Sequence, residues 1–192
     1  MKKTTLCISI LLLNLLCHAQ IILQNGQHKQ FADSLNKIVL DFKNNFSTIK
    51  GKQLNTEPEA IVFVSKICLP AAKNCTVKKY TSTEDKTASW QALLYSSDNF
   101  DETIKMYKKF FAQIKAVNIN GVDKIGTSFF GKLEKMDENV RFFTSTLRLK
   151  TDNVYFKNLA VAIELTNNYA GWDIYVNIYS KKIDVDDDGA DE

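Results

Sequence analysis

Residues 154–182 read VYFKNLAVAIELTNNYAGWDIYVNIYSKK, two long runs of alternating apolar and polar residues in which only Lys157 interrupts the pattern. The apolar positions are Tyr155, Leu159, Val161, Ile163 and Leu165 in the first run, and Trp172, Ile174, Val176 and Ile178 in the second. Residues 167–171, Asn-Asn-Tyr-Ala-Gly, separate the runs and are rich in residues that favour turns. Alternation of this length predicts an antiparallel hairpin with one buried face.

The rest of the chain predicts two amphipathic helices and several more strands. Apolar residues at steps of three and four predict a helix from about His28 to Lys50, ended by Gly51. A second helix should begin after Asn99, which can cap it together with Glu102. Strands are expected over 59–67, 77–81, 88–95, 125–130 and 140–150, with 77–81 at a sheet edge because of its lysines. The predicted fold class is α+β, with two amphipathic helices packed on a mainly antiparallel sheet in the order helix–strands–helix–strands.

The two predicted helices align at an offset of 65 residues, and each precedes a run of strands. A tandem duplication produces this pattern, and so do two unrelated amphipathic helices that share one period. The element order is similar to that of secreted α+β modules such as the PepSY and β-lactamase-inhibitor-protein folds. This resemblance covers the order of the elements alone, and no functional residue carries over from it.

The N-terminus is typical of a secretory signal peptide over residues 1–19. Two lysines precede an apolar run from Leu6 to Leu16, and Ala19 offers a cleavage point before Gln20. The run is too short for a membrane span. In the alternative, Cys17 becomes a lipidated N-terminus, although Leu16 precedes it where bacterial lipoprotein signals carry a small residue. We therefore expect a secreted or periplasmic protein with one α+β domain over 20–183 and an acidic tail over 184–192.

The charge distribution argues against nucleic acid as a partner. Without the signal peptide the chain has 23 basic and 22 acidic residues, a net charge of +1. Domains that bind nucleic acid usually carry a much larger positive charge. Six acidic residues fall in the last nine positions, so the remainder carries +7. Only Arg141 and Arg148 are arginines, whereas phosphate sites tend to recruit arginine.

Two cysteines remain after the signal peptide, Cys68 and Cys75, separated by six residues that include a proline. In an oxidising compartment this pair predicts a local disulfide. A redox-active pair is the alternative, but such pairs usually have the closer Cys-x-x-Cys spacing at the start of a helix.

The sequence lacks the residue sets of the common catalytic sites, and we predict no cofactor. The mature chain has a single histidine, His28, at the start of the first predicted helix, so serine or cysteine catalysis has one poorly placed candidate base. One histidine and two cysteines that are expected to form a disulfide cannot supply an ordinary zinc site. The tail contains Asp184, Asp186, Asp188 and Gly189 in the spacing of the first half of a calcium loop. The sequence stops short of the glutamate that completes such a loop, so we expect a solvated acidic tail and no metal site.

The polar face of the 154–182 hairpin is the best candidate site. Its predicted binding residues are Glu164, Tyr175, Asn177 and Tyr179, which alternate outward beside Ala160 and Ala162. Tyrosines beside small residues suit the recognition of a protein or a carbohydrate. The alternative is that a helix covers this face and the tyrosines belong to the core.

These patterns give one leading functional hypothesis and two others. The leading one is an exported, non-catalytic binding or interaction module that uses its sheet. The second is a carboxylate-dependent hydrolase of the cell envelope in which Glu164 and Asp173 form an acid pair. The third is a structural envelope component.

Overall fold

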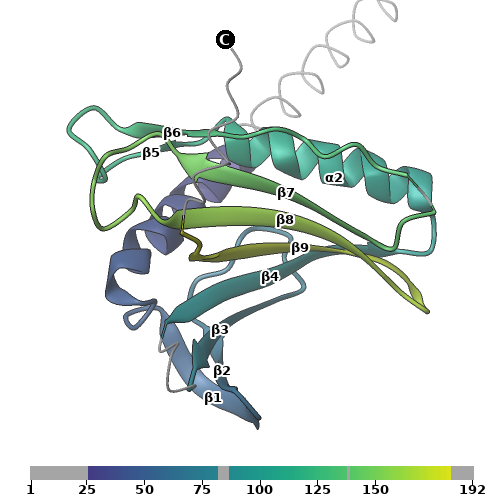
Figure 1. The fold of residues 1–192 in the computed structure, drawn as a ribbon, viewed down its shortest axis with the longest axis horizontal. Coiled ribbons are helices and arrows are strands. Elements are labelled where there is room, and N and C mark those ends of the chain that lie inside the picture. The colour runs from purple at the N-terminus through teal and green to yellow at the C-terminus, as the bar shows by residue number, and fades with distance from the viewer. Residues whose placement is uncertain (1–25, 82–86, 138, 183–192) are drawn as a thin grey trace, which may run out of the picture.

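The computed structural model describes residues 26–81, 87–137 and 139–182, and the predicted signal peptide and acidic tail lie outside them. This part of the chain forms two helices and a nine-stranded antiparallel sheet (Figure 1). The helices are residues 26–41, extended by the 3-10 turn η1 (Phe42–Asn44), and α2 (Phe100–Lys115). The strands are β1 (Lys50–Glu57), β2 (Ala60–Ser65), β3 (Asn74–Tyr80), β4 (Ala88–Ser97), β5 (Asn118–Ile119), β6 (Thr127–Phe130), β7 (Phe142–Leu149), β8 (Leu159–Asn168) and β9 (Gly171–Ser180).

The α+β class is confirmed, but the sheet dominates more than the sequence predicted, and the order of elements differs in detail. Strand β1 follows the first helix after η1 and a short turn, and the two-residue strand β5 follows α2. Neither strand was expected. Because β1 pairs with β2 at the edge of the sheet, β3 lies inside the sheet, and its prediction as an edge strand was wrong.

The sheet is built from two antiparallel meanders that join along β4 and β9. Its spatial order is β1-β2-β3-β4-β9-β8-β7-β6-β5. Helix α2 carries the chain from β4 in the middle to β5 at the far edge, and the second meander then returns to β9 (Figure 1). The pairing of β4 with β9 runs from Trp90 opposite Ile178 to Ser97 opposite Trp172. Two segments about 80 residues apart in sequence therefore become neighbours, at the strand spacing of about 4.8 Å.

The predicted hairpin is β8–β9, and its apolar face is buried as expected. Leu159, Val161, Ile163 and Leu165 are fully buried, as are Ile174, Val176 and Ile178, while Trp172 is 7% exposed. Tyr155 does not belong to this face, since it is 67% exposed. The Asn153 side chain accepts the Tyr155 N–H, and the Asn153 carbonyl accepts the N–H groups of Phe156 and Lys157. These bonds hold residues 154–158 in turns and bury Phe156 in place of Tyr155.

Both helices pack on the same face of the sheet and share one core with it. Phe31, Leu35 and Ile38 of the first helix belong to the same buried cluster as Phe111 and Ile114 of α2. The cluster also contains the inward-facing residues of the central strands, such as Trp90, Val161 and Val176. In the part of the chain that the structure describes, neither helix has the length and apolar character needed to cross a membrane.

The first helix ends nine residues earlier than predicted, because a buried carboxylate closes its C-terminus. Asp41 is 4% exposed, and its carboxylate accepts the N–H groups of Thr48 and Ile49. Asn45 adopts a left-handed conformation (φ 54°), which asparagine tolerates, and its side chain accepts the Ala88 N–H. The apolar period continues to Ile49, but the residues after 44 form turns that lead into β1.

Helix α2 begins where the sequence predicted. The Asn99 side chain accepts the Glu102 N–H at 3.0 Å, as a capping residue should. The Tyr107 hydroxyl, fully buried, lies 2.8 Å from both Ser145 Oγ and the Ile163 carbonyl oxygen. Since a carbonyl can only accept, Tyr107 donates to Ile163, and the Ser145 hydroxyl must supply the other hydrogen. This contact fixes the middle of α2 over β7 and β8.

Candidate functional site

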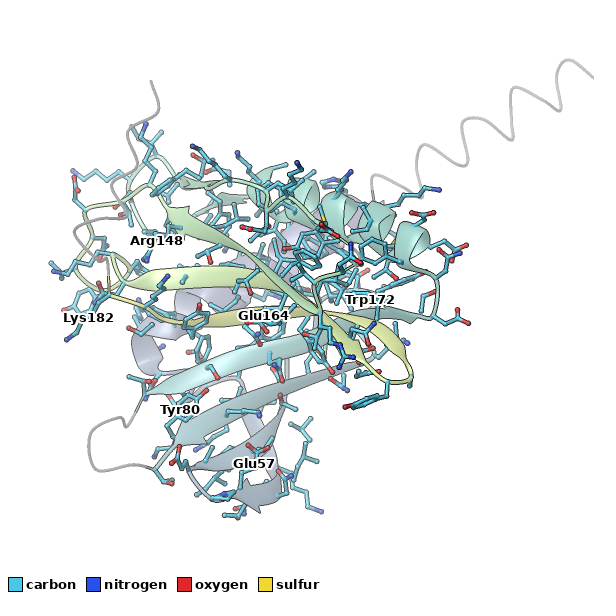
Figure 2. All side chains as sticks on the ribbon, turned by 45° about the vertical axis from the view of Figure 1, so that its right-hand side comes forward. Glu57, Tyr80, Arg148, Glu164, Trp172 and Lys182 are labelled. Atoms are coloured by element: carbon cyan, nitrogen blue, oxygen red, sulfur yellow. A yellow bond between two sulfur atoms is a disulfide. The ribbon has the colours of Figure 1, made fainter. Side chains whose placement is uncertain are left out.

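The face of the sheet opposite the helices, named the open face, carries the predicted site residues. No helix of the described residues covers this face. The alternative prediction, in which a helix buries the tyrosines in the core, is therefore wrong for these residues. Tyr175, Asn177 and Tyr179 of β9 are half-buried, as is Glu164 of β8, which Figure 2 shows at the centre of this face. Ala160 and Ala162 are fully buried between their longer neighbours.

Strand register sets the position of each side chain on the open face. Asn177 lies opposite Ala162 of β8 on one side and opposite Gln91 of β4 on the other. Glu164 of β8 lies opposite Tyr175 of β9, two residues along each strand from the pair formed by Ala162 and Asn177. Because side chains alternate along a strand, Glu164, Gln91 and Asn177 all point away from the helices.

A hollow of about 330 Å³, named the open-face hollow, lies on this side of the sheet. It is lined by Lys78, Tyr80, Thr87, Ser89, Gln91, Glu164, Asn177, Tyr179 and Ser180. Three of the four predicted binding residues therefore come together around one space. The fourth, Tyr175, does not line it.

The lining residues from β3 and β4 were missed by sequence reasoning. Lys78 and Gln91 lie in strands that were predicted, but no local pattern says that β4 pairs with β9. The Tyr80 hydroxyl lies 3.5 Å from Ser89 Oγ, so the Tyr80 side chain reaches from β3 toward β4. The only available signal was the alternation of residues 77–81, which places Lys78 and Tyr80 on one face.

The electrostatics of the hollow centre on Glu164. Burial raises the pKa of Glu164, and a hydrogen bond from the Asn177 side chain opposes part of this rise. Burial also raises the pKa of Tyr179, with a further rise from the charge of Glu164 and an opposing effect of Arg148. Lys78 is held by Glu57 of β1, with a distance of 3.3 Å between Lys78 Nζ and Glu57 Oε2. The hollow therefore contains one half-buried acid beside a phenol and a lysine that already has a partner.

Asp173, the second acid of the hydrolase hypothesis, forms its hydrogen bonds outside the open-face hollow. It is 8% exposed, and its carboxylate accepts hydrogen bonds from the Asn168 side chain and, at 3.4 Å, from the Tyr175 hydroxyl. Burial and then the charge of Asp173 raise the pKa of Tyr175. Asp173 thus ties the β8–β9 turn to β9, and it does not line the hollow.

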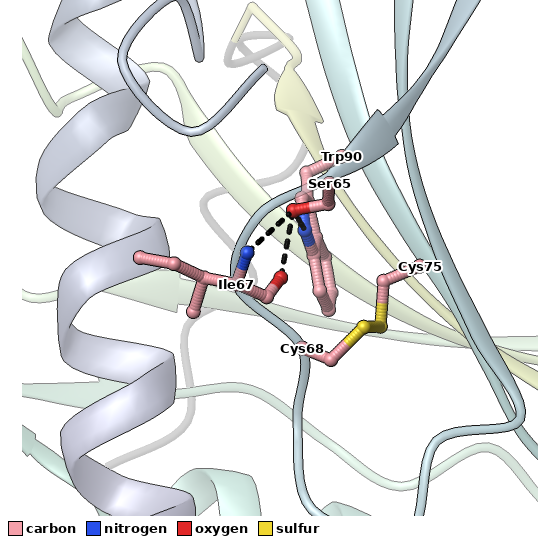
Figure 3. Close-up of a disulfide and its surroundings, with 5 residues drawn as sticks. All are labelled: Ser65, Ile67, Cys68, Cys75 and Trp90. Atoms are coloured by element: carbon pink, nitrogen blue, oxygen red, sulfur yellow. Dashed lines mark hydrogen bonds between the residues drawn. A yellow bond between two sulfur atoms is a disulfide. The ribbon is translucent and has the colours of Figure 1, made fainter. Parts of the chain in front are cut away.

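The predicted disulfide between Cys68 and Cys75 is present, and it lies at the start of β3 (Figure 3). Beside it, the Trp90 indole N–H donates to Ser65 Oγ at 3.0 Å, and the Ser65 hydroxyl donates to the Ile67 carbonyl at 2.7 Å. Cys75 is 4% exposed and Trp90 is fully buried. These contacts fix the beginning of β3, the strand that brings Lys78 and Tyr80 to the hollow.

A larger hollow of about 600 Å³ lies between the first helix, α2 and the loop around Pro70. His28, the single histidine outside the predicted signal peptide, is at its rim. None of the other described residues that line it offers a hydroxyl, a thiol or a carboxylate, so His28 has no catalytic partner there.

Within the described ranges, no three residues of the metal-binding types His, Cys, Asp and Glu gather as a possible metal site. The possible calcium loop at Asp184–Gly189 lies outside these ranges.

Comparison with known proteins finds no match: no family model, no curated protein and no solved structure is similar to this chain. Of the two hollows described above, only the open-face hollow is lined by predicted binding residues.

Proposed function

We propose that this protein is an exported binding module that holds a small polar ligand in the open-face hollow. The observation that carries the proposal is that Glu164, Asn177 and Tyr179 line one space of about 330 Å³, which is within the range of small-ligand sites. A raised carboxyl pKa inside a concave site is a further mark of a functional position.

Export is supported by two independent features. The N-terminal sequence has the charged start, apolar run and small-residue end of a signal peptide. The disulfide between Cys68 and Cys75 is of the kind that persists in oxidising compartments. A location outside the cytoplasm, in the periplasm or the medium, accounts for both.

A ligand screen tests the proposal. The mature chain is mixed with sugars, amino acids, short peptides, nucleosides and organic acids, and the thermal midpoint is measured. A ligand present at about 100 times its dissociation constant stabilises the folded state by about 2.7 kcal/mol, which should raise the midpoint by several degrees. A tenfold weaker affinity in Tyr179→Ala should reduce this stabilisation to about 1.4 kcal/mol and so roughly halve the shift, whereas Tyr155→Ala removes the same ring from an exposed loop and should leave the shift unchanged. A shift of equal size in both variants would place the ligand elsewhere.

The hydrolase is a second candidate because Glu164 has the raised pKa that a general acid needs. Its weakness is that the lining residues of the hollow include no second carboxylate. Turnover of nitrophenyl glycosides that disappears in Glu164→Gln would favour the hydrolase, and binding without turnover favours the binding module.

A further inference from the structure

We infer that the ligand of the open-face hollow is a neutral saccharide of one or two rings. This inference rests on the proposed function of the same hollow and deepens it.

The hydrogen-bonding groups of the hollow suit a ligand that both donates and accepts. Gln91 and Asn177 face each other across β4 and β9, with Cβ atoms about 5 Å apart at such a pair. Each amide has two N–H donors and a carbonyl acceptor, and one donor of Asn177 is used by Glu164, which lies diagonally beside it. The other donor of Asn177, the two amide carbonyls and the second lone pairs of the Glu164 carboxylate suit a ligand with several hydroxyl groups. Neighbouring hydroxyl groups on a sugar ring match a row of alternating donors and acceptors.

Aromatic side chains supply the apolar part of the surface. Tyr80 and Tyr179 are half-buried, so part of each side chain remains available for the C–H groups of a sugar ring. Ala160 and Ala162 of β8, opposite Tyr179 and Asn177, are fully buried and do not line the hollow. The two phenol rings therefore supply the apolar contact, and a sugar ring packed against Tyr179 lies beside the amides.

Charge argues against ionic ligands. An anion in the hollow would face Glu164, and the one cation among the described lining residues, Lys78, is already paired with Glu57. A cation would be attracted by Glu164 but would lie beside Lys78, which lines the same space. A neutral polyhydroxylated ligand avoids both costs, and its hydroxyl groups can donate to the Glu164 carboxylate.

The size of the hollow limits the ligand. Its volume of about 330 Å³ is at the lower end of the range of about 300–1,000 Å³ for small-molecule sites. This space accepts one sugar ring, with a second ring extending over the open face.

Calorimetric titration of the mature chain tests the inference. The probes are glucose, galactose, mannose, N-acetylglucosamine and their disaccharides, with spermidine as a cationic probe and citrate as an anionic one. We expect at least one neutral sugar to bind. Asn177→Ala and Tyr179→Ala should each weaken it about tenfold, equal to about 1.4 kcal/mol, while Tyr155→Ala should leave it unchanged. Far-UV circular dichroism and urea unfolding of each variant show whether it remains folded.

A measurement on the unaltered protein covers the case in which these variants fail to fold. Because the sugar hydroxyls donate to ionised Glu164, affinity should fall as the pH drops through the raised pKa of this residue. In Glu164→Gln the affinity should not change over the same range.

The outcomes separate the two proposals. Binding of spermidine or citrate alone, lost in Asn177→Ala and Tyr179→Ala, overturns the saccharide and leaves the ligand site in place. A sugar that binds equally well to wild type and to both variants overturns the hollow as its site, and with it the proposed function. Absence of heat with every sugar overturns the saccharide inference.

Discussion

Reduction of the disulfide between Cys68 and Cys75 should destabilise the protein by a predictable amount. The bond joins the loop after β2 to the second residue of β3, with a separation of seven positions and a Cα–Cα distance of 5.6 Å. Cys68 is exposed, so a soluble reductant can reach it, whereas Cys75 is buried.

The magnitude follows from the eight residues in the closed loop. Closing a loop of this length removes about 8 cal/mol/K of chain entropy from the unfolded state, or about 2.5 kcal/mol at 25 °C. For a chain of this size each kcal/mol changes the thermal midpoint by about 2–4 °C, so reduction should lower it by about 5–10 °C.

Urea unfolding with and without dithiothreitol measures the effect. Trp90 and Trp172 are both buried, which makes tryptophan fluorescence a direct probe of unfolding. The double variant Cys68→Ala, Cys75→Ala is the control, since it should match the reduced protein and should not respond to dithiothreitol. Strand β3 pairs with β2 and β4 on its two sides, so the native fold should persist without the bond.

Two results would refute this reasoning. If the urea midpoint of the wild type is the same with and without reductant, the bond does not constrain the unfolded chain as the loop length implies. If the double variant loses stability on addition of dithiothreitol, the reductant acts through something other than this disulfide.

Three further predictions concern single side chains. Tyr107→Phe should lower the free energy of unfolding by about 1–3 kcal/mol in urea, because it leaves the buried Ile163 carbonyl without its hydroxyl donor; no change would show that this contact contributes nothing. Burial raises the pKa of Glu164, so the folded state keeps this proton to higher pH than the unfolded chain, and the resulting stability is lost as the pH rises through the raised pKa. Glu164→Gln should remove this component from the pH dependence of urea unfolding, and identical curves for the variant and the wild type would contradict the assignment. Asn99→Ala should destabilise α2 by about 1 kcal/mol, and Asn99→Ser should restore most of it, as measured by thermal unfolding; equal losses in both would exclude capping as the cause.

Local patterns predicted the elements whose structure depends on local rules. The alternation through Leu159–Leu165 and Trp172–Ile178 identified the central hairpin, because a strand with one buried face repeats every two residues. Asn99 marked the start of α2, because a helix begins where a side chain can accept its free N–H groups. The disulfide followed from the spacing of two cysteines in a chain whose N-terminal sequence predicts export.

Where local prediction failed, a specific contact overrode the pattern. The period of the first helix continues to Ile49, yet the carboxylate of Asp41 accepts the N–H of this residue and holds it in a turn. Tyr155 fits the alternation of its hairpin, but Asn153 turns the chain before β8 begins. A polar side chain that hydrogen-bonds to backbone groups competes with regular secondary structure. The local sequence does not show which of the two arrangements is more stable.

The sequence by itself determined the α+β class, the buried side of the β8–β9 hairpin and the residues that alternate out of it, because these depend on periods of two and 3.6 residues that are written into the chain. Only the tertiary structure decided that both helices cover the same face and that β4 lies beside β9. These two features of the fold leave the polar face open, and they bring Gln91 and Lys78 into the same hollow as Glu164 and Asn177. The physical reason is that strand pairing between distant segments is selected by the burial of the whole sheet, and no short stretch of sequence records which neighbour a strand will have.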